Sequence, residues 1–180
     1  MHMAMREKWK VIYKICNYSV IDNNVIWLQY RILYGILGTR EYLNKLKISS
    51  TSICALCNQN DKDIDHLLYK CKEVKQLWNN VQQWIKNKLA INLEFTTLMK
   101  TLGYLETDNN FWPINFILIS TRKYIFSCSR NAKKPNIFYL QKEIKKAYYE
   151  QRILSILNCK SETFNKRWFF WKNIFNEIET

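Results

Sequence analysis

Four side chains of the types that bind soft metal ions lie in one short segment of the chain: Cys54, Cys57, His66 and Cys71. Their spacing is C-x2-C-x8-H-x4-C. Three thiolates and one imidazole complete the tetrahedral ligand set of a structural zinc site, and a closed set leaves no open position for a substrate. The spacing therefore predicts a structural Zn²⁺ ion rather than a catalytic one.

Two other readings of these cysteines remain open. Free cysteines are often buried as small apolar side chains, and cysteines can also pair as disulfides. The C-x2-C pair followed by a histidine and a cysteine favours zinc, and the polar, acidic residues 58–65 suit a solvated turn between the ligand pairs. No secretory signal is recognisable before them, which disfavours disulfides. Cys16, Cys128 and Cys159 lie far apart in sequence, and we expect them in the core.

The segments that would position this site are predicted to be helical. The chain has Gly 3 and Pro 2, which favours helices joined by short connections. The clearest helix covers residues 72–89, where apolar residues recur at helical spacing, so Cys71 would lie at its start. Gly38 is the expected end of the helix over residues 24–34. Thr39 is the expected cap of the helix over residues 41–46. Further helices are expected over residues 6–16, 24–34, 41–46, 96–102, 113–128, 135–154 and 161–178.

These elements predict a mostly α fold, an irregular helical bundle with a zinc-stapled turn and little or no sheet. We expect three parts: an N-terminal helical segment, residues 1–50; the zinc site with its following helix, residues 51–92; and a basic C-terminal helical segment, residues 93–180. A looser stretch from residue 90 to 110 is the expected hinge. No apolar run approaches the roughly 18–20 residues that cross a bilayer, so no membrane partner is expected.

The formal net charge of +13 favours a polyanionic partner, either a nucleic acid or an anionic surface. The basic loop before Pro135 is the strongest candidate contact, because a loop beside a proline is exposed and concentrates charge. Each basic residue can equally be a solvated surface charge. The candidate phosphate contacts are Lys70, Lys72, Lys75, Arg122, Lys123, Arg130, Lys133 and Lys134.

The sequence shows no catalytic pattern. It has no phosphate-binding G-x-x-x-x-G-K-[ST] loop, no H-E-x-x-H, and no paired aspartates after an aromatic residue. The one well-placed histidine, His66, is assigned to the metal, which disfavours a histidine-based nucleophile relay. We therefore expect no enzymatic activity.

Two stretches carry a family resemblance. V-I-W-L-Q-Y-R-I-L-Y-G-I-L-G-T-R-E-Y-L-N-K-L-K-I-S-S-T-S-I-C-A-L-C and D-H-L-L-Y-K-C-K-E-V-K-Q-L-W-N-N-V-Q-Q-W-I resemble the zinc-binding region after the reverse transcriptase domain of non-LTR (LINE-type) retrotransposon proteins. R-K-Y-I-F-S-C-S-R-N-A-K-K-P-N-I-F-Y-L and F-N-K-R-W are similar to the C-terminal tail of those proteins. The matching positions are Thr39, Leu43, Cys54, Cys57, His66, Leu67, Cys71 and Trp78.

The resemblance implies a non-catalytic, zinc-stabilised module that binds template RNA or target DNA. The reverse transcriptase domain of the same polyprotein would be a possible partner, and the location would be intracellular, in nucleus and cytoplasm. The chain departs from the short retroviral knuckle, with x8 before the histidine and Asp65 in place of a glycine, so base recognition by that knuckle is not carried over. The alternative is a protein–protein docking module or an inactive retroelement remnant.

Overall fold

The computed structural model describes residue 12 and residues 23–59, 63–105 and 112–175. Within these ranges it contains helices and loops and no strand, which confirms the mostly α prediction. The predicted helix over residues 6–16, apart from residue 12, and the expected core residue Cys16 lie outside the described residues. No helix of the described part is long and apolar enough to cross a membrane.

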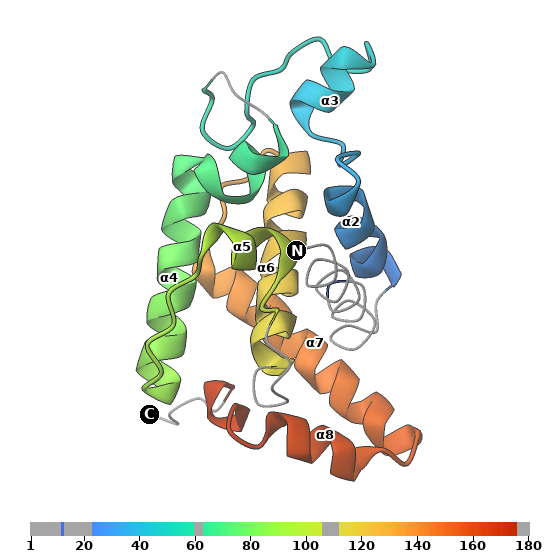
Figure 1. The fold of residues 1–180 in the computed structure, drawn as a ribbon, viewed down its shortest axis with the longest axis vertical. Helices are drawn as coiled ribbons and strands as arrows, with labels where there is room; N and C mark the ends of the chain where they lie inside the picture. The colour runs from blue at the N-terminus through green and yellow to red at the C-terminus, as the bar shows by residue number, and fades with distance from the viewer. Residues whose placement is uncertain (1–11, 13–22, 60–62, 106–111, 176–180) are drawn as a thin grey trace, which may run out of the picture.

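Helix α6 (Trp112–Arg130) runs through the middle of the bundle, as Figure 1 shows. Its consecutive residues Pro113 to Ile119 are all buried, as expected for a helix surrounded by others. It contacts α2 (Asn23–Leu33), α5 (Thr97–Leu102), α7 (Ile137–Leu157), α8 (Ser161–Trp168) and the π-helix η1 (His66–Lys70).

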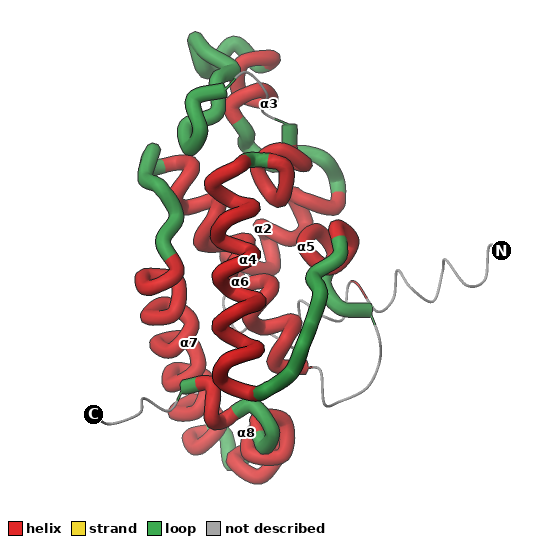
Figure 2. Tube along the Cα trace, turned by 90° about the vertical axis from the view of Figure 1, so that its left-hand side faces the viewer, coloured by secondary structure: helices red, strands yellow, loops and turns green. Residues whose placement is uncertain are grey.

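Helix α4 (Lys72–Leu89) has the predicted bounds. Its apolar stripe faces the core: Val74, Leu77, Trp78, Val81 and Ile85 are all buried. Figure 2 shows α4 with α7 to one side and α8 across the lower end. The helix ends at Ala90, whose left-handed conformation (φ 56°) closes the last turn.

Two short helices begin at threonine caps, of which Thr39 was predicted and Thr96 was not. Thr39 accepts a hydrogen bond from the backbone N–H of Tyr42 at the start of α3 (Arg40–Lys45), and Thr96 accepts one from Met99 at the start of α5. The predicted end of α2 at Gly38 is wrong. The chain leaves α2 at Gly35, which has φ +69°, a conformation that glycine adopts without strain.

The C-terminal segment also differs from the prediction. Helix α8 ends at Trp168 and a short 3-10 helix, η3 (Lys172–Ile174), follows; Ile178 lies outside the described residues. The break lets Trp168, Trp171 and Phe175 all reach the core, where Trp168 and Phe175 lie with ring centroids 5.4 Å apart.

The described part of the stretch expected as a hinge, residues 90–105, packs against the bundle. Phe95 is buried with its ring centroid 5.7 Å from that of Trp78. Asn115 accepts from the backbone N–H of Tyr104 at 2.7 Å and donates to the carbonyl of Tyr104 at 2.9 Å. One core cluster includes residues from all three expected parts; the division into those parts stays a prediction.

Candidate metal centre

The first two ligands lie on a tight loop before η1. The backbone N–H of Asn58 donates to the carbonyl of Cys54 at 2.9 Å, and the N–H of Cys54 donates to the carbonyl of Gln59 at 3.1 Å. Asn58 adopts the left-handed conformation (φ 56°) that turns the chain after Cys57. These bonds fold the C-x2-C segment back on itself and bring both thiols to one side.

The other two ligands lie at the two ends of η1: His66 is its first residue and Cys71 follows its last. The N–H of Cys71 donates to the carbonyl of His66 at 2.9 Å, an i to i+5 bond that brings these ligands together. Cys71 is then the N-cap residue of α4, and its carbonyl accepts from Lys75 at 2.8 Å. Such single π-turns occur often at functional sites. The prediction that the last ligand starts a helix is confirmed.

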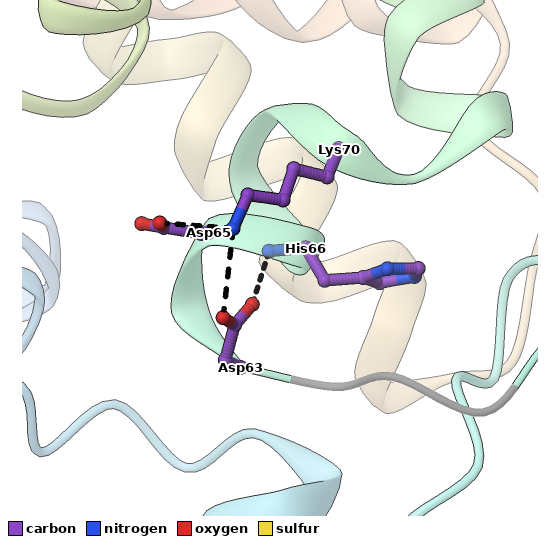
Figure 3. A network of polar contacts seen from close by, with 4 residues as sticks. All are labelled: Asp63, Asp65, His66 and Lys70. Carbon is purple, nitrogen blue, oxygen red and sulfur yellow. Dashed lines mark hydrogen bonds and ion pairs between the residues drawn. The ribbon is translucent and has the colours of Figure 1, made fainter.

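Acidic side chains hold the start of η1, as Figure 3 shows. Asp63 accepts a hydrogen bond from the backbone N–H of His66. Lys70 lies 3.2 Å from a carboxylate oxygen of Asp65 and 3.8 Å from one of Asp63. From the sequence, this segment was predicted only as an acidic loop. The three-residue spacing between Asp63 and His66 is typical of a helix cap and could have predicted the hydrogen bond between them.

The four donor atoms converge on one point. The sulfur atoms of the three cysteines and a ring nitrogen of His66 all lie within 4.8 Å of one another, and Cys57 Sγ is 3.4 Å from His66 Nε2. Because zinc–sulfur bonds are about 2.3 Å long, two sulfurs on one ion are at most about 4.6 Å apart. The donor set therefore fits a single zinc ion with small side-chain adjustments.

Burial and charge also suit a metal. Cys54, His66 and Cys71 are buried, and Cys57 is partly so. The hydrogen bond between the two buried thiols lowers the pKa of Cys54 to about 4 and raises the pKa of Cys71 above its ordinary value. A thiolate at neutral pH is the form of cysteine that binds a metal. When bound, zinc would be coordinated by all four residues and would cross-link the loop to η1.

The metal centre continues directly into the core. The indole N–H of Trp78 donates to the carbonyl of Leu68, inside η1, at 2.8 Å. Leu68 and Trp78 are both fully buried. Trp78 thus belongs to the core, and its hydrogen bond fixes the ligand-bearing turn against α4.

Of the two described cysteines outside the ligand cluster, one is in the core as predicted and one is not. Cys128 is buried on α6 as expected. Cys159 is exposed, so its placement in the core is wrong. It follows the end of α7 in a left-handed conformation (φ 54°), and the chain there turns at the surface.

One predicted phosphate contact is corrected by the structure. Arg122 is only 1% exposed, and its Nη1 donates to the carbonyls of Met99 and Lys100 at 3.2 and 3.3 Å. These carbonyls belong to the last turns of α5, where a cation interacts well with the helix dipole. Arg122 thus ties α5 to α6 and cannot reach a nucleic acid.

The other candidate cations are exposed, and two of them pair with carboxylates. Lys70 pairs with Asp63 and Asp65, and Lys134 lies 3.7 Å from Glu73 at the start of α4. This second pair brings the basic loop after α6 beside the helix that begins at the last ligand. The remaining exposed candidates are Lys72, Lys75, Lys123, Arg130 and Lys133.

Comparison with known proteins supports the assignment of the metal centre. A family model described as zinc-binding in reverse transcriptase matches residues 2–78, a range that includes all four ligands. This match confirms the resemblance to a zinc-binding region associated with reverse transcriptases. It ends at Trp78, within α4, so the resemblance of the later stretches and the LINE-type subtype stay predictions. No curated protein and no solved structure matches the chain.

Proposed function

We propose that the chain is a non-catalytic nucleic-acid-binding module, in which a structural zinc ion fixes the helices that present basic residues. In this role it would bind template RNA or target DNA as part of, or beside, a LINE-type reverse transcriptase. The observation that supports it most is the Lys134–Glu73 contact of 3.7 Å. It brings the basic loop of the C-terminal segment against the first turn of α4, directly after the ligand Cys71.

This contact gathers candidate cations that are far apart in sequence. Lys72 and Lys75 extend from the start of α4, and Lys133 and Lys134 come from the loop between α6 and α7. All four side chains are exposed. Exposed lysines concentrated at one end of a protein with a net charge of +13 are suited to phosphate binding.

Zinc has an indirect part in this function. Its four-ligand set is closed, so the ion supplies cross-linking rather than chemistry. Its loss would release η1 and the first turn of α4, and with them Lys72 and Lys75. Binding would then weaken because the cations are no longer held together, although none of them touches the metal.

A salt titration of RNA and DNA binding tests the proposal. We expect the logarithm of the binding constant to fall linearly with the logarithm of salt concentration, with a slope of about 0.9 per neutralised duplex phosphate. The double substitution Lys72→Gln, Lys133→Gln should reduce that slope by about 2. Lys166→Gln is the control, since Lys166 is exposed on α8 and pairs with Glu162 at 2.8 Å. Absent or salt-independent binding would contradict the proposal.

A specific surface favours the second candidate function, protein–protein docking. Ile153, Ile156 and Leu157 at the end of α7 are 58%, 57% and 72% exposed. Their spacing places them on neighbouring positions of one helix surface. If nucleic acid does not bind, and Leu157→Lys abolishes association with a purified reverse transcriptase domain, the docking function replaces the nucleic-acid one.

A further inference from the structure

A groove with a distinctive lining runs between α2 and α6, two helices that lie side by side in Figure 1. Its volume is about 570 Å³. The lining residues that matter here are Trp27 and Arg31 from α2, and Lys123, Phe126 and Arg130 from α6. The two helices are about a hundred positions apart in sequence, so no local pattern predicts the groove.

Among the residues that the structure describes, the charged side chains that line the groove are all positive. Neither α2 nor α6 contains an aspartate or a glutamate, and the lining includes Arg31, Lys123 and Arg130. Glu143 on α7 acts electrostatically on Lys123 from outside the groove. A groove whose described lining has three cations and no carboxylate attracts an anionic chain.

An exposed aromatic stripe starts at the groove, because its first ring, Trp27, is one of the lining residues. Trp27 and Tyr30 on α2 and Tyr34 directly after its end follow one another at i, i+3 and i+7 and are 59%, 39% and 55% exposed. The ring centroids are 5.6 Å apart for Trp27 and Tyr30 and 4.3 Å apart for Tyr30 and Tyr34. The core does not explain these rings, because the buried face of α2 consists of Val25, Leu28, Gln29 and Ile32.

Cations and exposed rings together are the recognition chemistry of single-stranded nucleic acid, in which a basic groove follows the backbone and aromatic rings stack on unpaired bases. We infer that the groove between α2 and α6 binds single-stranded RNA or DNA. In the groove, Arg31, Lys123 and Arg130 contact phosphates and Trp27 stacks on a base, and Tyr30 and Tyr34 extend the stacking surface beyond the groove. A duplex gives the rings nothing to stack on. This inference rests on the proposed function and assigns it a site and a strand preference.

The test measures binding of the full zinc-loaded chain by fluorescence anisotropy. The probes are an oligouridine of about 12 nucleotides, within the range of single-strand sites, and an RNA duplex of the same length. We expect tighter binding of the single strand and quenching of tryptophan fluorescence. An unlabelled polyglutamate peptide serves as competitor. If it displaces the probe as well as unlabelled oligouridine does, the groove accepts acidic proteins and the inference is wrong.

Two variants separate stacking from charge. Trp27→Leu should weaken single-strand binding about tenfold at every salt concentration and leave the salt slope unchanged, since stacking releases no counterions. Arg31→Gln should reduce the slope by about 0.7, the contribution of one single-strand phosphate. The matched controls are Phe170→Leu and Arg152→Gln, because both residues are exposed and neither lines the groove.

The outcomes distinguish this site from the broader function. If the wild-type chain binds but neither Trp27→Leu nor Arg31→Gln changes its affinity, the groove is not the site and nucleic-acid binding stands. If duplex and single strand bind equally, the strand preference is wrong. If neither probe binds at low salt, both the groove assignment and the proposed function fail.

Discussion

The metal centre and the groove between α2 and α6 are built in opposite ways. The metal centre takes all its ligands from one short segment, Cys54 to Cys71, and most of them are buried. The groove combines helices that are far apart in sequence, and its basic and aromatic residues face solvent. In the first region a metal ion would cross-link buried side chains, and in the second the side chains present charge and aromatic surface to solvent. We therefore expect substitutions in the first region to change stability, and those in the second to change binding.

Loss of the metal should produce the largest effect. Structural zinc sites can contribute on the order of 10 kcal/mol to folding, which is as much as many domains have in total. Cys57→Ser, or chelation of the wild-type protein, should therefore abolish the cooperative melting transition and much of the helical circular dichroism. Cys159→Ser is the matched control because Cys159 is exposed and does not belong to the ligand cluster. An unchanged melting curve after chelation would contradict a structural metal.

Neighbouring residues on α6 provide the sharpest test of the contrast. Arg122→Met removes the buried donor to the carbonyls of Met99 and Lys100, and we expect the free energy of unfolding to fall by about 3 kcal/mol. Lys123→Met changes an exposed residue that lines the groove. Its unfolding free energy should stay within about 0.5 kcal/mol of wild type, while single-strand affinity falls. Urea unfolding and anisotropy measure the two effects; equal destabilisation by both variants would remove the distinction.

The same pair shows where prediction from sequence ends. The metal ligands and α4 were predictable because their signals are local: a ligand spacing and a stripe at helical period. Arg122 was predicted as an exposed phosphate contact, but α6 is surrounded by other helices over much of its length. In such a helix, the charge of a side chain does not indicate that it faces solvent. Only the packed position of α5 shows that Arg122 faces inward.

The groove was missed for a related reason. The sequence shows Trp27, Tyr30 and Tyr34 at helical spacing, which is equally typical of a buried stripe. Val25, Leu28 and Ile32 form a competing stripe on the same helix, and these are the residues that the core buries. The choice between the two stripes depends on where α6 lies, which is a tertiary contact without a local signal.

Trp78→Phe tests how strongly the metal centre depends on the core. The change removes the hydrogen bond to the Leu68 carbonyl and leaves space in a fully buried site. The lost bond and the cavity together should cost about 2–3 kcal/mol, and zinc should dissociate at a lower chelator concentration. Trp84→Phe is the control, since Trp84 is only partly buried on the same helix. Equal losses in both variants would show that the bond to η1 adds little.

The smallest predicted effect is a pH dependence away from the metal centre, at the contact between α6 and the start of α7. Tyr124 on α6 accepts a hydrogen bond from the backbone N–H of Asn136, the cap of α7, at 3.1 Å. Burial raises the pKa of Tyr124 to about 12, and the neighbouring Cys128 and Glu143 add to this shift. Below pH 10 the phenol is protonated in both the folded and unfolded states, so its full contribution to stability is present.

Between pH 10 and 12 the unfolded chain loses the Tyr124 proton first, because its pKa is the ordinary value, and the folded protein keeps the proton. Unfolding is therefore favoured as pH rises through this range, and the zinc-loaded protein should lose about 2 kcal/mol of stability. Tyr124→Phe should be less stable than wild type at pH 8 but should lose less stability on going to pH 12. Urea unfolding of both proteins across this range measures the difference. If the unfolding free energies of wild type and Tyr124→Phe fall in parallel with pH, the pKa of Tyr124 is not raised by burial and the prediction is wrong.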